Sequence, residues 1–210
     1  MLTAAICLLT VLPQTYTLAW RPKKNDTVVY EYYMQDKTVS VEAAVEYHVT
    51  KVGSDGGYTV RSKSLGAMIR TNGQEMRDER PNERTADFDA RGRLVSYGDK
   101  PTAEQLRTVY LTRFVAPEGP VGPGETWKVD FKNDPAPPTT TEYTLASVTG
   151  GFAVVTFKSD EKTGDHPQSA QGSWWIDVST GQPTKFEATV TNFMGREGSE
   201  TTLRLTRRGR

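Results

Sequence analysis

Apolar and polar residues alternate along residues 38–52, TVSVEAAVEYHVTKV. The odd-numbered positions from Val39 to Val49 are apolar and fall on one side of an extended chain, whereas the positions between them are mostly polar. A period of two is typical of a β-strand with one buried and one solvated face. We therefore predict a long strand here.

The same signal recurs along most of the chain. Segments rich in β-branched and aromatic residues alternate with glycine turns at spacings of roughly 8–12 residues, as in antiparallel meanders. The other predicted strands are TVVYEYYMQ, GYTVRSKS, TWKVDF, TEYTLASV, FAVVTFKS, SWWIDV, TKFEATVTNF and TTLRLTRR. The predicted fold is mainly β, an antiparallel curved sheet or half-barrel of about 10–12 strands.

Residues 102–115 have helical periodicity instead. Thr102 and Gln105 have the spacing of a capping box. Arg107 and Arg113 lie off the apolar stripe of this helix. The stripe consists of Ala103, Leu106, Val109, Tyr110 and Phe114. We expect one helix, about 102–115, to pack this stripe on the sheet.

The chain also contains an internal repeat. EYHVTKVGSDGGYTV (46–60) resembles EYTLASVTGGFAV (142–154), and FDARGRLVSY (88–97) resembles IDVSTGQPTKF (176–186). Repeats of this kind indicate duplicated structural units. Chance similarity between β-hairpins is the alternative explanation.

Two similar β units follow from the repeat, residues 20–98 and 119–207, joined by the helix. Trp20 and Trp127 each precede the first strand of their unit. Each unit is too small and open to fold alone, so we predict a single domain over residues 20–210 with one continuous sheet.

Composition excludes some classes of protein. Aromatic residues make up 10% of the chain, enough for a core, so disorder is not expected. The 26 Lys and Arg residues balance 26 Asp and Glu residues. A net charge of zero argues against nucleic acid as the main partner.

Residues 1–19 are uncharged, with an apolar run from Leu2 to Leu12 and small residues at its end. This pattern predicts a signal peptide, since it is too short for a stable membrane span. A buried N-terminal strand or helix is the alternative. Cys7 is the only cysteine and lies within this segment, early in the apolar run. We expect an exported bacterial protein, periplasmic or extracellular, without disulfides or a lipid anchor.

The stretch GPVGPGETWKVDF, residues 119–131, is rich in glycine and proline. A phosphate-binding loop would need a strand before the glycines and a helix after them, and the predicted order here is the reverse. We predict a turn that leads into a strand.

Candidate catalytic and metal-binding residues are few. Ser159 and Lys162 have Ser-x-x-Lys spacing, but they end a predicted strand, whereas acyl-transfer chemistry needs them on a helix. The two histidines, His48 and His166, have no set of partners typical of zinc. The acidic cluster around His166 is expected to be a solvated hairpin tip; it consists of Asp160, Glu161 and Asp165.

Asp87 and Asp89 fall on one strand face, the pattern of paired carboxylates. Asp89 also precedes the Gly92 turn, as its repeat partner Asp177 precedes Gly181, so we favour a turn role. We therefore predict no catalytic residues, no metal site and no cofactor.

Trp174 and Trp175 are adjacent on a predicted strand and must point to opposite faces. One should enter the core. The other is either packed or exposed, and an exposed tryptophan would mark a ligand or partner surface.

The apolar N-terminus, the central helix and the EYHVTKV, FDARGRL and GPVGPGETW motifs together resemble bacterial secreted proteins and lipoproteins grouped as domains of unknown function. Their outline is similar to the half-barrel of the lipoprotein carriers (LolA/LolB-like). That resemblance implies an apolar cavity between sheet and helix. It assigns no ligand-binding residue.

We expect a non-catalytic binding protein with an apolar, lipid- or lipoprotein-like ligand between sheet and helix. The alternative is a structural or protein-interaction module of the bacterial cell envelope with no small-molecule ligand. An enzyme is a third and weaker hypothesis, because no nucleophile, acid–base pair or metal set stands out.

Overall fold

The computed structural model describes residues 14–80 and 82–209. The strands of this part are β1 (Thr27–Gln35), β2 (Val39–Val52), β3 (Tyr58–Thr71), β4 (Gln74–Asp78), β5 (Glu83–Phe88), β6 (Leu94–Tyr97), β7 (Thr126–Phe131), β8 (Thr139–Thr149), β9 (Phe152–Glu161), β10 (Ser169–Asp177), β11 (Pro183–Thr191) and β12 (Glu200–Arg207). The helix α1 (Ala103–Thr112) and a short 3-10 turn, η1 (Phe193–Gly195), complete the described elements.

All 12 strands form one antiparallel sheet. Its order is β6-β5-β3-β2-β1-β12-β11-β10-β9-β8-β7, and β4 pairs with the far end of β3. The two ends of this order, β6 and β7, do not pair with each other, so the sheet curls without closing. The predicted mainly β fold with one helix is confirmed.

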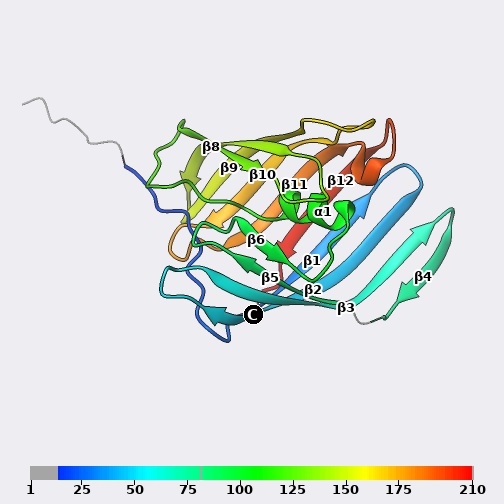
Figure 1. Cartoon of the computed structure of the whole chain (residues 1–210), viewed down its shortest axis with the longest axis horizontal. Helices are drawn as coiled ribbons and strands as arrows, with labels where there is room; N and C mark the ends of the chain where they lie inside the picture. Colours follow the sequence, from blue (N-terminus) through cyan, green and yellow to red (C-terminus); the bar gives the residue numbers. More distant parts are fainter. Residues whose placement is uncertain (1–13, 81, 210) are drawn as a thin grey trace, which may run out of the picture.

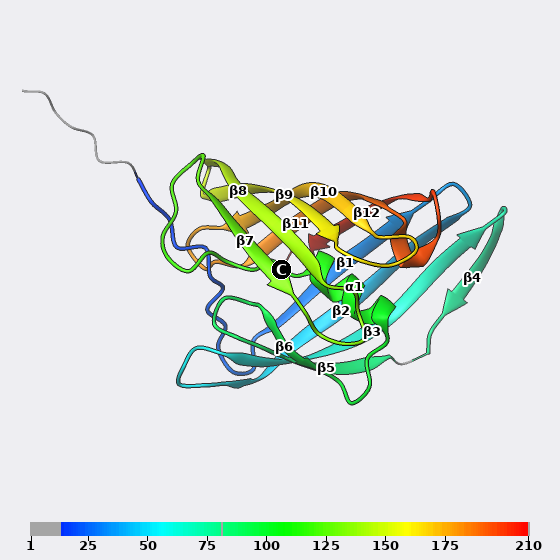
Figure 2. The ribbon, with the colours of Figure 1, turned by 45° about the horizontal axis from the view of Figure 1, so that its top comes forward.

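The helix α1 lies on the concave side of the sheet (Figure 1). Seen from another side, strands β8–β12 run on one side of α1 and strands β1–β6 on the other (Figure 2). The connection between the two end strands therefore crosses the interior of the half-barrel, where its side chains meet both units of the sheet.

Bulges support the internal repeat. The register shifts past Thr50 in the β2–β3 hairpin and past Ala146 in the β8–β9 hairpin, and the repeat aligns these two residues. A second aligned pair of shifts falls at Val95 in the β5–β6 hairpin and at Thr184 in the β10–β11 hairpin. Because bulges are specific local features of a strand, their equivalent positions agree with two similar units.

The helix ends earlier than its sequence pattern predicts. Its start is as expected: Thr102 and Gln105 form the capping box. Its last residue is Thr112, and Arg113 is already extended, with φ −122° and ψ 122°. The segment after the helix instead bonds to the β5–β6 turn, where the Ala116 N–H donates to the Arg91 carbonyl (2.9 Å). Tertiary hydrogen bonds thus replace the last predicted helical turn.

The first unit contains more strand than predicted. The segment GYTVRSKS continues to Thr71 as the long strand β3, which has a bulge at Gly66. A short strand, β4, then folds back on its end. The sequence of β4, QEMRD, has one apolar residue and therefore no alternating signal.

Part of the N-terminal segment is built into the fold. Residues 1–13, most of the predicted signal peptide, lie outside the described residues. Tyr16 pairs with Val121 through two backbone hydrogen bonds of 2.9 and 3.0 Å, and Leu18 is completely buried. A Cβ at Gly181 would lie 2.0 Å from the Ala19 carbonyl oxygen, so this segment packs directly on the β10–β11 turn.

Candidate functional site

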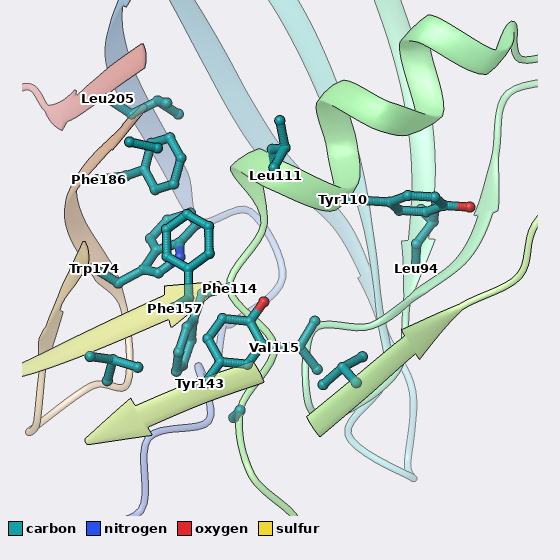
Figure 3. Close-up of a cluster of buried hydrophobic side chains, with 14 of the residues drawn as sticks. Leu94, Tyr110, Leu111, Phe114, Val115, Tyr143, Phe157, Trp174, Phe186 and Leu205 are labelled. Atoms are coloured by element: carbon teal, nitrogen blue, oxygen red, sulfur yellow. The ribbon is translucent and has the colours of Figure 1, made fainter. Parts of the chain in front are cut away.

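The half-barrel interior is filled on the side of the second unit. Leu111 and Phe114 lie among aromatic side chains of β8–β11 (Figure 3). The rings of Phe114 and Trp174 are 6.0 Å apart, and those of Trp174 and Phe186 are 4.4 Å apart. Side chains on the inner face of β9–β12, such as Val155 and Leu203, are completely buried. The described side chains therefore pack densely between α1 and this half of the sheet.

The inner face of the first unit is less covered. Although Val49 is completely buried, most inward positions of β1 and β2 are apolar but only half-buried, in contrast to those of β9–β12. These positions are Val28, Tyr30, Tyr32, Met34, Val41, Ala43, Val45 and Tyr47. Partly exposed, contiguous apolar surface is characteristic of a surface that binds something.

A cleft of about 330 Å³ lies between α1 and strands β2, β3, β5 and β6. Val109 and Thr112 line it from the helix, and Phe88 and Tyr97 line it from the sheet. Ligand pockets commonly have volumes of about 300–1,000 Å³, so this cleft is at the lower end of that range. Met194 of η1 lies beside it and is 46% exposed.

A smaller space continues inward from the cleft. This inner cavity, about 40 Å³, is lined by aromatic rings from both units, including Tyr30, Tyr58 and Trp174. Arg113 and Thr112 line both spaces, so the inner cavity and the cleft meet at the end of α1. The inner cavity has room for a few atoms of water size.

Arg113 stands where the two spaces meet. Its guanidinium carbon is 4.2 Å from the ring centroid of Tyr47 and 4.8 Å from that of Phe88, which is cation–π geometry. Within residues 14–80 and 82–209, Arg113 forms no ion pair and its side chain donates no hydrogen bond. The aromatic contacts hold the plane of the guanidinium but leave its N–H groups free.

Trp174 supplies a second free donor. The residue is 3% exposed, and its Nε1 has no acceptor among the described residues. A buried donor without a partner costs about 1–3 kcal/mol. Natural proteins rarely leave such groups unpaired except at functional sites or beside bound water.

Tyr30 and Tyr58 of the inner cavity remain protonated at neutral pH. Burial raises the pKa of Tyr58 to about 12, and the nearby charge of Arg113 only partly opposes this effect. Burial raises the pKa of Tyr30 in the same way. Their hydroxyls are therefore neutral, and they do not neutralise Arg113.

A buried ion pair fixes α1 to the second unit. Arg107 Nε and a nitrogen of the same guanidinium donate to the two Glu161 oxygens at 2.6 and 3.0 Å, and the Gln168 N–H donates to Glu161 at 2.8 Å. The Glu161 side chain is only 1% exposed. The prediction that Glu161 belongs to a solvated hairpin tip is wrong, because the helix covers this end of β9.

The other members of that cluster are placed apart. Asp160 and Asp165 are exposed, and His166 lies 3.9 Å from Glu197. His48 contacts Thr27 on the outer face of the sheet. Among the described residues, no three His, Cys, Asp or Glu side chains gather as metal ligands.

Ser159 and Lys162 do not form a catalytic pair. The Ser159 hydroxyl is buried and shares a 2.8 Å hydrogen bond with Thr141 on the neighbouring strand. Lys162 follows the end of β9 and is exposed. The two residues are on a strand and its loop, as expected, and not on a helix.

Asp87 and Asp89 have separate structural partners. Hydrogen bonds from the Ser96 and Thr59 hydroxyls, 2.6 Å each, lower the pKa of Asp87. Asp89 accepts backbone N–H bonds within the β5–β6 turn, and Asp177 does the same in the β10–β11 turn. The predicted turn role of Asp89 is confirmed.

The remaining candidates are also structural. Residues 119–131 form a turn followed by β7, and the Trp127 indole donates to the Val115 carbonyl at 2.9 Å. Trp174 enters the core, as predicted for one of the two adjacent tryptophans, while Trp175 is half-buried on the outer face beneath Lys185.

A wide depression on the outer face of β1–β3 and β12 is a weaker candidate. It measures about 940 Å³, and several of its charged residues form ion pairs on the surface of the sheet. Arg208 pairs with Glu31, and Glu42 pairs with Arg70 nearby. The cleft beside α1, together with the inner cavity and its unpaired donors, is the better candidate site.

Comparison with models of known protein families gives no match for this chain, and a search of curated proteins gives none either. Within the described part of the chain, the helices are too short or too polar to cross a membrane. The site must therefore be interpreted from its own chemistry.

Arg113 and the half-buried inner face have no clear sequence signature. Arg113 lies off the apolar stripe of α1, a position that usually faces solvent. It turns inward because the chain leaves the helix at Thr112. The apolar faces of the strands predict buried surface in both units alike. Which of these faces the helix covers depends on packing between distant segments, and no local pattern shows it.

Proposed function

We propose that this protein is a non-catalytic binding protein that holds an apolar ligand between the first β unit and α1. The half-buried apolar face of β1 and β2, next to the cleft, is the observation that supports this function. The filled second unit supplies a rigid frame, and the Arg107–Glu161 pair holds the helix on that frame. A ligand on the first unit would remove exposed apolar surface from water, which favours binding.

We further propose that the protein is exported to the periplasm or the exterior of a bacterial cell. The uncharged apolar N-terminus supports this location. Since Tyr16 and Leu18 contact the rest of the fold, we expect the export segment to be cleaved before Tyr16. N-terminal sequencing of protein recovered from its host tests this expectation, and a chain that starts at Trp20 would contradict it.

Filling the cleft tests the binding function. Val109→Trp places a large side chain in the cleft, whereas Val95→Trp adds the same group at a position that is 59% exposed on β6. With the uncharged fluorescent probe N-phenyl-1-naphthylamine, we expect saturable uptake by the natural protein and Val95→Trp, and loss of uptake in Val109→Trp. Circular dichroism verifies that both variants fold.

Absence of saturable probe uptake by the natural protein, together with ligand-free native mass spectra of protein purified gently from its host, would overturn the binding function. The alternative, a structural or protein-interaction module of the cell envelope, would then be favoured. Its supporting observation is the densely filled interior of the second unit.

A further inference from the structure

Arg113 differs from the other arginines of the interior. Arg107 is paired with Glu161, and Arg91 binds the Ala116 carbonyl and Glu118. Arg207 binds the side chain of Gln182. Arg113 alone among these four has no acceptor in the described part of the chain, although it is half-buried. A guanidinium in this setting retains donors that a ligand can use.

The inner cavity is also electrostatically one-sided. Its lining contains two arginines, Arg91 and Arg113, and no aspartate or glutamate. The carboxylate whose charge affects the pKa of Tyr58 is Asp89, which accepts from the N–H groups of its own turn and from Arg93. Tyr30 and Tyr58, which line the cavity, are uncharged groups. Because Arg91 is paired with Glu118, the uncompensated positive charge beside the cavity is that of Arg113, and an incoming anion would meet this charge.

Two residues that line this space carry donors without a partner among the described residues. The Arg113 guanidinium offers a planar fork of N–H groups, and the buried Trp174 Nε1–H lacks an acceptor. Both residues line the inner cavity, and the ring of Phe114 lies against that of Trp174. A carboxylate is planar and offers two oxygens, so it can accept from a guanidinium in bidentate fashion and from a further N–H.

The sizes of the two spaces complete the argument. The inner cavity of about 40 Å³ is large enough for a small polar group only, whereas the cleft of about 330 Å³ can hold an apolar chain. Arg113 lines both, at their junction. A molecule with an anionic head and an apolar tail matches this arrangement.

We propose that Arg113 and Trp174 form a head-group site for the carboxylate of a long-chain carboxylic acid whose tail occupies the cleft. This inference rests on the proposed binding function and specifies its ligand class. The carboxylate lies at the inner end and satisfies the free donors, and the chain runs outward between α1 and the first unit. Selectivity for the acid over neutral lipids follows from Arg113.

A pair of ligands of equal length separates the two proposals. Hexadecanoate and hexadecanol are titrated below their aggregation limits, with tryptophan fluorescence as the signal. We expect hexadecanoate to bind roughly ten- to a hundredfold more tightly, as charge-assisted hydrogen bonds provide. Equal affinity for both would overturn the head-group site and leave the binding function intact. Binding of neither would overturn the binding function itself.

Arg113→Met keeps the length and apolar contacts of the side chain and removes its charge. We expect this variant to lose the preference for hexadecanoate while its affinity for hexadecanol is unchanged. Arg204→Met is the matched control, because the Arg204 guanidinium also lies over a tyrosine ring, 5.6 Å from Tyr33, but on the outer face.

A second variant tests the head-group site independently, in case Arg113→Met does not fold. Trp174→Phe retains an aromatic ring and removes the indole N–H, so we expect several-fold weaker binding of hexadecanoate only. Thermal unfolding of each variant shows whether it is folded at the temperature of the titration. A folded Arg113→Met protein that still prefers hexadecanoate as strongly as the natural protein would contradict the head-group site.

Discussion

Arg107 and Arg113 belong to one short segment but meet opposite electrostatic environments. Arg107 reaches the second unit and is neutralised by Glu161, with both side chains largely buried. Arg113 faces the first unit and lies over Tyr47 and Phe88 without a carboxylate in the described residues. One arginine therefore fixes the helix, while the other remains available to a ligand.

Removing the charge of Glu161 should be costly, because Arg107 would remain buried without its counterion. Loss of one partner of a buried pair typically costs about 3–5 kcal/mol, and we expect Glu161→Gln to lower the free energy of unfolding by this amount. Chemical denaturation measures it.

Glu142→Gln is the control for that experiment, since Glu142 pairs with Lys128 on the surface and is 47% exposed. Its midpoint of unfolding should remain close to that of the natural protein, because water screens exposed pairs. Similar losses in the two variants would show that burial of the Arg107–Glu161 pair has no special effect.

At the scale of elements, the β5–β6 turn determines where α1 ends. Arg91 exchanges backbone and side-chain hydrogen bonds with Ala116, 2.9 Å each. Gly92 has φ +87°, and a Cβ there would lie 2.8 Å from the Phe114 carbonyl oxygen. This close approach holds the extended segment after the helix, and with it the side chain of Arg113, against the first unit.

Gly92→Ala should be more destabilising than Gly150→Ala. Both glycines have positive φ, which costs alanine about 1–2 kcal/mol, but only Gly92 has backbone within contact distance. We expect the larger loss of thermal stability in Gly92→Ala, together with weaker probe uptake by the cleft. Equal losses in the two variants would mean that the turn does not position the segment after α1.

At the scale of the whole molecule, one continuous sheet unites the two units through the β1–β12 pairing. The N-terminal segment reinforces this arrangement from outside the strands. Tyr16 pairs with Val121, Leu18 enters the core, and Trp20 packs against Tyr58 with ring centroids 5.3 Å apart. The segment thus contacts both the chain before β7 and the first unit.

Leu18→Ala should therefore cost about 2–5 kcal/mol, the range for truncation of a fully buried leucine. Leu65, which is 46% exposed on the β3 bulge, is the matched leucine, and its replacement by alanine should change stability by about 0.5 kcal/mol or less. Denaturant titration of the full chain compares the two. A small effect at Leu18 would mean that the N-terminal segment is not part of the stable core.

Much of this architecture follows from local pattern. Alternation identifies β2, and β-branched and aromatic residues identify β1, almost to the residue, while Thr102 with Gln105 marks the start of α1, because these signals depend on neighbouring residues. The aligned turns at Asp89 and Asp177 likewise come from short motifs. β4 was not predicted, since an exposed edge strand needs no apolar face.

The sequence by itself determined a mainly β protein with one amphipathic helix, because alternation, turn residues and caps are local properties. Only the tertiary structure decided which unit the helix packs against most closely, where the helix ends, and which of the two arginines, Arg107 or Arg113, is neutralised by a carboxylate. Those features depend on contacts between Arg107 and Glu161, or Arg91 and Ala116, that are distant along the chain. The unpaired donors of Arg113 and Trp174 arise from the same packing, and no local pattern encodes them.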